Sequence, residues 1–273
     1  MSFNAQSIAD AFVAARLGGQ ILDSYPGAMP ATMDQAYAVQ NCAIAAFPDR
    51  IAAWKVGLMS DADQARLGLE TPRFAGPIFA RTVHHYAGSG VQEMPVFANG
   101  LASVEGEFVF RTTRDMTAAD AHDLTDLIAS TALHYGVEIP SSPFRGINLN
   151  GPTCTVSDFG NNRGLIVGGE ISDWQARDWH DLEVEILVDG ASIGRASGPV
   201  IPGTPLTALR FMLGHLSGRG LPVPAGTFIT TGAVVGINDR SPGFAARVEF
   251  PGFGGIDVAL VAVSPAQGSS GPR

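Results

Sequence analysis

The sequence predicts an α+β protein in which a small, helix-rich N-terminal region precedes a rolled, mixed β-sheet of barrel-like form. Helical patterns dominate the first third of the chain, whereas from about residue 90 the chain is rich in Gly, Val and Ile. There, short runs alternate between apolar and polar residues, and few helical patterns interrupt them. Many short strands with few helices favour a rolled sheet over a doubly wound one. We expect an N-terminal region over residues 1–90, a β-rich domain over 91–264 and a flexible tail over 265–273.

The individual elements follow from apolar periodicity and from residues that cap helices. Ser7 can cap the first helix, in which Ile8 and Phe12 recur at a four-residue step. Pro205 stands in the first turn of the last helix, where proline is tolerated. The strands are expected in LASVEGEFVFR, DLEVEILVDGASIG and ARVEFPGFGGIDVALVAV, which alternate. The full prediction comprises a short strand ending at Gly57 and helices over residues 7–22, 32–47, 60–70, 117–134 and 205–216.

Composition excludes several classes of function. The formal net charge is −9 and the pI is near 5.0, so no basic excess is available for nucleic acid or an anionic membrane. Cys42 and Cys154 lack the spacing of a disulfide framework or a zinc site. No secretory leader, no long apolar span and no glycine-rich nucleotide motif is recognisable. The sequence therefore predicts a cytoplasmic protein.

A pair of acids in SVEGEFVF is the first candidate for chemistry. Glu105 and Glu107 are two residues apart, so on a strand they point to one face and repel each other unless a cation lies between them. Mg²⁺ and Mn²⁺ prefer such oxygen ligands. Glu183 and Glu185 have the same spacing, but there we expect the apolar neighbours to face inward and the acids to face water. Spacing alone therefore does not separate the two pairs.

Eight segments, in order, resemble the 2-keto-4-pentenoate hydratase and 4-oxalocrotonate decarboxylase branch of the fumarylacetoacetate hydrolase superfamily. The resemblance covers roughly residues 8–263. The segments are AYAVQ (36–40), KVGLMS (55–60), VEGEFVF (104–110), VEIP (137–140), GLIVGG (164–169), SGPVIPGTPLTAL (197–209), PAGTFITTGA (224–233) and GFGGIDV (252–258). The resemblance implies a fumarylacetoacetase-type catalytic domain and a metal-dependent lyase of aromatic catabolism. The implied reaction is the hydration of 2-hydroxypenta-2,4-dienoate, also called 2-keto-4-pentenoate, or of a close analogue.

The resemblance also assigns site residues. It implies that Mg²⁺ or Mn²⁺ binds to three glutamates and that a lysine faces the active site, where it stabilises the substrate carboxylate or a developing enolate. A Thr-Gly pair approaches the small 2-oxo acid substrate. The residues that match are Glu105, Glu107 and Glu138 for the metal, Lys55 for catalysis, and Thr231 and Gly232 for the substrate.

Departures from the family pattern leave the reaction open. The family's EIVDSR reads EIPSSP here, so its Asp falls at Ser141 and its Arg at Pro143. SDFGNNRG is only an approximate equivalent of ADN-x-SSG. In GPIFARTVHH, Arg81 stands about where an acid is common, and His84 or His85 is a candidate general base that would suit a more anionic substrate.

Several alternatives therefore remain beside the hydratase. They are a decarboxylase of a 4-oxalocrotonate-type acid, a hydrolase that cleaves a C–C bond of an acylpyruvate, and a non-catalytic partner subunit. The resemblance further implies a homo-oligomer and a complex with a decarboxylase or aldolase of the same pathway.

Overall fold

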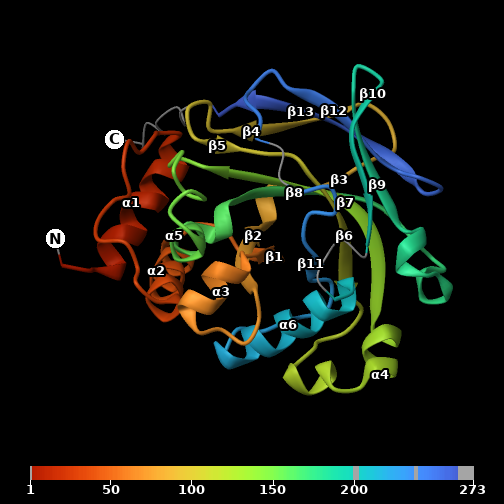
Figure 1. Ribbon diagram of the computed structural model, residues 1–273, viewed down its shortest axis with the longest axis horizontal. Helices are drawn as coiled ribbons and strands as arrows, with labels where there is room; N and C mark the ends of the chain where they lie inside the picture. Colours follow the sequence, from red (N-terminus) through yellow and green to blue (C-terminus); the bar gives the residue numbers. More distant parts are fainter. Residues whose placement is uncertain (1, 199–202, 237–238, 264–273) are drawn as a thin grey trace, which may run out of the picture.

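A computed structural model describes residues 2–198, 203–236 and 239–263, and it consists of two β-sheets with helices gathered beside them (Figure 1). The predicted fold class is confirmed: helices are few, and the larger sheet is mixed and curled. None of the described helices is long and apolar enough to cross a membrane. The predicted tail over 265–273 lies outside the described residues.

The helices begin and end close to the predicted positions in the N-terminal region and near residue 205. Asn4 caps the first helix, rather than Ser7, and Gly19 ends it in the left-handed conformation. Thr32 caps the second. Short 3-10 turns join other elements. The α-helices are α1 (Ala5–Gly18), α2 (Met33–Ala46), α3 (Asp61–Leu67), α4 (Leu124–Ala129), α5 (Pro152–Ser157) and α6 (Pro205–Gly218).

The predicted helix over 117–134 is wrong. A 3-10 turn, η2 (Ala118–Ala121), is followed by α4, which Asp123 caps by accepting hydrogen bonds from the amides of Thr125 and Asp126. From Thr131 the chain is a strand that pairs with its neighbour over its first eight residues. The ladder formed by this long strand satisfies its backbone groups and overrides the local helical pattern.

The larger sheet has eight strands and curls on itself. Its order is β2-β1-β11-β6-β7-β8-β3, with β5 paired to β7 off this path, and β2 also contacts β8. The strands are β1 (Ile51–Leu58), β2 (Arg73–Phe79), β3 (Val83–His85), β5 (Leu101–Ala102), β6 (Glu105–Thr112), β7 (Thr131–Ser142), β8 (Asn162–Glu170) and β11 (Phe228–Thr230). Strands from both sides of residue 90 share this sheet, so a domain boundary there stays a prediction.

The smaller sheet has five strands and packs against the outside of the curled one. Its order is β10-β9-β12-β13-β4, and β9 contacts β6 while β13 and β4 contact β8. It lies at the top of Figure 1, away from helices α1, α2 and α5. The strands are β4 (Val91–Val96), β9 (Glu183–Val188), β10 (Ala191–Ser197), β12 (Ala245–Phe250) and β13 (Gly254–Ala262).

Candidate active site

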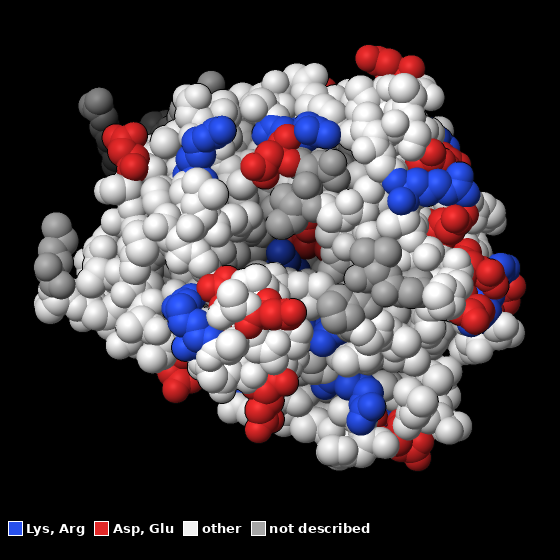
Figure 2. All heavy atoms as spheres, viewed as in Figure 1, with Lys and Arg blue, Asp and Glu red and all other residues white. Residues whose placement is uncertain are grey.

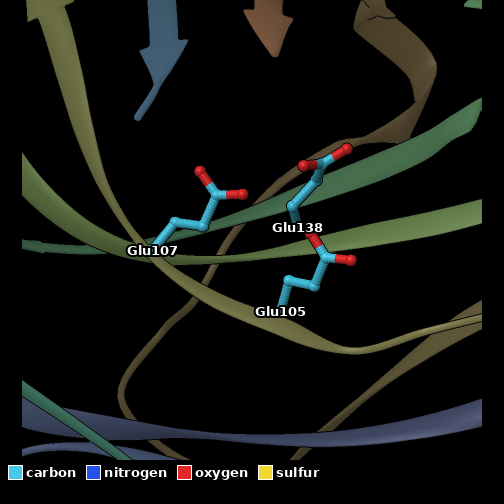
Figure 3. Close-up of side chains that lie close together, drawn as sticks. All are labelled: Glu105, Glu107 and Glu138. Carbon is cyan, nitrogen blue, oxygen red and sulfur yellow. The ribbon is translucent and has the colours of Figure 1, made fainter. Parts of the chain in front are cut away.

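Two neighbouring strands of the curled sheet bring three glutamates together. Glu105 and Glu107 lie on one face of β6, and Glu105 is directly opposite Glu138 of β7 in the antiparallel ladder. One carboxylate oxygen from each lies within 4.8 Å of one from each of the others. The three side chains rise from the same side of the two strands in Figure 3. The structure thus joins residues that are 33 positions apart at most in the chain.

Gly106 explains why this strand carries the acids on its inner face. A Cβ atom there would lie 2.4 Å from Cγ1 of Val184 in β9 and 2.8 Å from Cγ1 of Val248 in β12. The outer face of β6 is therefore packed tightly against the smaller sheet, and only glycine fits. Glu105 and Glu107 consequently point away from the smaller sheet, into the curl of the larger one.

The three carboxylates are buried and incompletely paired. The exposed fraction is 5% for Glu105 and 0% for Glu107 and Glu138. Oε1 of Glu107 and Oε2 of Glu138 have no hydrogen-bond partner among the described residues. Unpaired buried oxygens are costly, so such atoms in a native protein point to a missing partner. A hard divalent cation is the partner that suits three oxygen donors.

Burial and mutual repulsion also raise the pKa values of two of these acids. Burial, with the charge of Glu138 second, raises the pKa of Glu105 to about 8. Burial and the charges of Glu138 and Glu105 hold the pKa of Glu107 well above its usual range. Without a cation the carboxylates resist ionisation, and a divalent ion would reverse that effect.

Lys55 supplies one positive charge to the cluster. It lies in β1, is 4% exposed, and its Nζ is 3.3 Å from Oε1 of Glu138. Nζ also donates a hydrogen bond of 3.2 Å to Oδ1 of Asn161. Burial alone would lower the pKa of Lys55, but the charges of Glu138, Glu105 and Glu107 together raise it above its ordinary value. The amine is therefore held in the ammonium form.

The Thr-Gly pair follows β11 and meets the cluster through its backbone. The amide of Gly232 donates a hydrogen bond of 2.7 Å to Oε2 of Glu107. Gly232 has a φ of 104°, which disfavours any side chain there. The hydroxyl of Thr231 is buried and donates to the carbonyl oxygen of Phe108, 2.9 Å away. Gly232 thus orients a glutamate and lines the cavity, while the Thr231 hydroxyl is engaged by backbone.

A second layer holds Glu138 and links it to the first helix. Nδ2 of Asn162 donates a hydrogen bond of 2.8 Å to Oε1 of Glu138. Arg16 of α1 donates from Nη1 to the carbonyl oxygen of Asn162 and from Nη2 to Oδ2 of Asp158, at 2.8 and 2.9 Å. Ser142 also donates to Asp158, at 2.6 Å. This buried network fixes the end of β7 at Ser142 and the start of β8 at Asn162, and Asn162 in turn holds Glu138.

A cavity of about 380 Å³ opens beside the glutamates. Figure 2 shows a hollow in this face with basic and acidic side chains at its base. Leu58, Met59 and Phe74 form an apolar wall, while Lys55 and Glu105 lie at the charged end. Other lining residues include Ser60, Asp63, Asn148, Gly151, Thr155 and Asn161. Asn148, which accepts a hydrogen bond of 2.9 Å from Nδ2 of Asn161, carries no sequence pattern that predicts it.

The structure places His84 and His85 elsewhere. They lie in β3, at the end of the curled sheet, and neither is among the described residues that line the glutamate cavity. Arg81 is exposed in η1 (Ala80–Thr82) and is also absent from that lining. Burial and the neighbouring His85 lower the pKa of His84. These positions remove the reason for assigning either histidine to the cavity, because a general base must reach the reacting proton.

The second acidic pair faces water, as predicted. Val184 and Ile186 of β9 are buried, whereas Glu183 and Glu185 are half-buried on the opposite face. Arg195 of the neighbouring strand pairs with both carboxylates, at 2.6 and 3.6 Å. The hydrogen bond from Arg195 lowers the pKa of Glu183, the reverse of the shift at Glu105.

Comparison with known proteins gives relatives with two names, 2-keto-4-pentenoate hydratase and 4-oxalocrotonate decarboxylase. The chain is 30% identical over 203 residues to a 2-keto-4-pentenoate hydratase from Paraburkholderia phymatum, and the match covers 73% of this chain and 75% of the relative. It is 26% identical over 216 residues to a 4-oxalocrotonate decarboxylase from Pseudomonas putida, covering 78% of each. No protein-family model matches the chain.

A solved structure has the same fold. It is that of 4-oxalocrotonate decarboxylase from Pseudomonas putida G7 complexed with magnesium and adipate. The TM-score is 0.77 at 23% sequence identity, and the superposition covers 94% of this chain and 97% of the other. At this identity the likeness establishes the arrangement of the two sheets and the helices.

Proposed function

The chain belongs to the 2-keto-4-pentenoate hydratase and 4-oxalocrotonate decarboxylase branch of the fumarylacetoacetate hydrolase superfamily, and we propose that it is a metal-dependent hydro-lyase. The substrate is 2-hydroxypenta-2,4-dienoate or a close analogue with one carboxylate. The observation that carries the proposal is the buried cluster of three glutamates and one lysine at the charged end of a cavity that is otherwise apolar on one side.

Glu105, Glu107 and Glu138 would hold Mg²⁺ or Mn²⁺. Three carboxylates and one ammonium carry a net charge of −2, which one divalent ion neutralises. The unpaired oxygens of Glu107 and Glu138 support this assignment. When bound, the metal supplies a Lewis acid that polarises a 2-oxo acid. Asn162 and the amide of Gly232 hold two of the ligands in place.

The remaining residues would bind the substrate and stabilise charge. The Lys55 ammonium faces the cluster, where it holds the substrate carboxylate or the negative charge that develops on the dienolate oxygen. Leu58, Met59 and Phe74 contact the hydrocarbon end of the dienoate. In the reaction the proton of the 2-hydroxyl is lost and the terminal carbon gains one. Water then adds to the carbon two removed from the 2-oxo carbon, which gives a 4-hydroxy-2-oxo acid.

The distribution of positive charge favours the hydratase over the decarboxylase. Lys55 is the only Lys or Arg among the described residues that line the cavity. The undescribed internal residues, 199–202 and 237–238, include no Lys or Arg in the sequence. A 4-oxalocrotonate-type acid has a second carboxylate, whose burial without a cation is costly. A substrate with one carboxylate, which the metal and Lys55 would contact, leaves no second carboxylate in need of a cation.

Direct assays test this proposal. Purified protein loaded with Mg²⁺ or Mn²⁺ is expected to hydrate 2-hydroxypenta-2,4-dienoate, and the loss of the substrate's ultraviolet absorbance measures the rate. The kcat/KM for this reaction is expected to exceed those for decarboxylation of 4-oxalocrotonate and cleavage of an acylpyruvate. EDTA is expected to abolish the reaction, and the Glu185→Gln variant serves as a matched control that keeps it. A higher kcat/KM for the diacid would reverse the assignment.

The other two alternatives lose support from the positions of the side chains. C–C hydrolysis needs a base that activates water, and His84 and His85 lie outside the cavity. A non-catalytic partner subunit has no need of a paired lysine and three buried glutamates. Failure of the purified protein to bind Mn²⁺ in a titration would bring that alternative back.

We also propose a cytoplasmic homo-oligomer that associates with a decarboxylase or aldolase of the same pathway. Both cysteines are free, which agrees with a reducing compartment. The family to which the chain belongs supports the assembly. Light scattering on the purified protein, alone and mixed with such a partner, measures both associations.

A further inference from the structure

A second cavity lies on the face of β6 that carries the glutamates, at the other end of the strand. Glu105, Glu107, Val109 and Arg111 alternate along β6 and therefore share one face. From Glu107 to Arg111 the strand advances by about 13 Å. Val109 lies between them and packs in a buried apolar cluster with Leu165, Val167, Phe228, Ala53 and Ile78. This apolar cluster separates an acidic end of the curled sheet from a basic one.

The basic end is hollowed to a volume of about 430 Å³, within the range of small-molecule sites. Arg50, Arg111, His85 and His134 line it, together with Phe228. The ring of Phe228 contacts both imidazoles, with centroid distances of 5.7 Å to each. No Asp or Glu is among the described residues of this lining. Glu170, opposite His134 in the ladder with β8, is exposed.

The guanidinium groups of this cavity lack protein partners within the described part of the chain. The guanidinium groups of Arg50 and Arg111 are exposed, and neither makes an ion pair or hydrogen bond there, although many other arginines of the described residues do. Nδ1 of His134 lies 3.2 Å from the carbonyl oxygen of Gly168 and so donates to it. Nε2 of the same ring is buried and has no partner. With Nδ1 donating, Nε2 of the neutral ring is an acceptor and does not contribute to anion binding. The two guanidinium groups beside the ring of Phe228 form a site suited to an anion with an apolar body.

We propose that this second cavity binds a small organic carboxylate, with Arg50 and Arg111 pairing with the carboxylate and Phe228 contacting its hydrocarbon part. The site is separate from the glutamate cavity, since the two have no lining residue in common among those described. His85, which the sequence singled out, belongs to this site. A failure of the proposed hydratase activity would leave this inference standing.

The six histidines of the chain provide local probes. In the Mg²⁺-loaded protein, NMR resonances of His85 and His134, assigned with His→Gln variants, are expected to move saturably when benzoate is added. His122, His180 and His215 lie outside this lining and are expected to stay unchanged. Benzyl alcohol, which lacks the charge, is expected to cause no saturable change, and inorganic phosphate to bind more weakly than benzoate because it lacks the apolar body.

Substitution of the two arginines completes the test. Arg111→Gln and Arg50→Gln are each expected to weaken benzoate binding about 10-fold or more, the effect of losing one charge-assisted contact. Arg195→Gln removes an exposed arginine elsewhere and is expected to leave the affinity unchanged. The inference fails if benzoate leaves the His85 and His134 resonances unmoved, if phosphate binds and benzoate does not, or if both arginine variants bind benzoate as tightly as the parent protein.

Discussion

Two strands of this protein carry the same Glu-x-Glu spacing and pack against each other back to back. β6 turns Gly106 toward Val184 of β9, so the glutamates of both strands point away from their shared contact. Those of β6 enter the curl of the larger sheet and meet Glu138. Those of β9 reach the surface and meet Arg195.

The difference shows that the environment of a strand face, buried or exposed to water, decides the role of an acidic pair. The Glu-x-Glu pattern alone does not. Inside the curl, burial raises the pKa of Glu105 to about 8 and the carboxylates collect around one lysine. At the surface, the hydrogen bond from Arg195 lowers the pKa of Glu183. The first pair is poised for a metal, whereas the second is a solvated ion pair of small energetic consequence.

The largest expected contrast is in metal binding. Glu107→Gln is expected to weaken Mn²⁺ binding by more than about 100-fold, beyond the loss typical of a group that only supports a ligand. Burial raises the pKa of Glu107, so this carboxyl must take up a proton when the metal-free chain folds at neutral pH. An amide avoids that cost, so the metal-free variant should be more stable to urea. Glu185→Gln is the matched control and should alter neither property. Calorimetric titration with Mn²⁺ and urea unfolding measure the two effects.

Equal Mn²⁺ affinity in the Glu107→Gln and Glu185→Gln variants would contradict the assignment of the metal to β6. A loss of affinity together with a loss of metal-free stability would instead indicate that Glu107 is needed for folding. The two measurements therefore separate a ligand from a structural residue.

The cations that accompany the two pairs give the next contrast. Lys55→Met is expected to lower kcat for hydration by about 100- to 1000-fold, as when a preorganised charge at a reacting oxygen is removed. Arg195→Met removes the cation of the surface pair and should leave kcat and KM unchanged. Steady-state kinetics with saturating Mg²⁺ compare the variants. A normal kcat in Lys55→Met would exclude an electrostatic role for this ammonium.

The sequence predicts part of this site and misses the rest for physical reasons. Alternation predicts that Glu105 and Glu107 share one face, but only the family resemblance indicates Glu138, because its position opposite Glu105 depends on strand pairing. Arg16 and Asp158 are 142 residues apart and no local pattern joins them. One sequence feature does indicate a partner for Arg16. It follows Phe12 by one helical turn on the buried face of α1, where a charged side chain requires a partner.

His84 and His85 show the opposite case, in which residues that local sequence suggests for the site lie outside it. His84 and His85 lie close in sequence to the segment that resembles part of the family's site, yet β3 carries them to another part of the curled sheet. The error over 117–134 has a similar origin, because pairing with β6 and β8 decides the conformation of β7. In both cases non-local strand pairing, which the sequence does not display, overrides local pattern.

The smallest expected contrast is in the pH dependence of stability without metal. Glu105 keeps its proton to about pH 8 in the folded metal-free protein, whereas the ordinary value of 4.5 applies to the unfolded chain. Between these values the folded state binds more protons than the unfolded state, so the free energy of unfolding falls as pH rises. The slope for one proton is at most about 1.4 kcal/mol per pH unit.

Urea unfolding of the EDTA-treated protein at roughly pH 5, 6.5 and 8, which span this window, measures the slope. Glu105→Gln should reduce the slope because an amide has no proton to release, while the raised pKa of Glu107 maintains the remainder, and Glu183→Gln should leave the slope unchanged. Saturating Mg²⁺ should remove most of this slope, because the metal keeps the carboxylates ionised in the folded state as they are in the unfolded state. An equal slope in the Glu105→Gln variant would show that the buried face of β6 is not what sets this pH dependence.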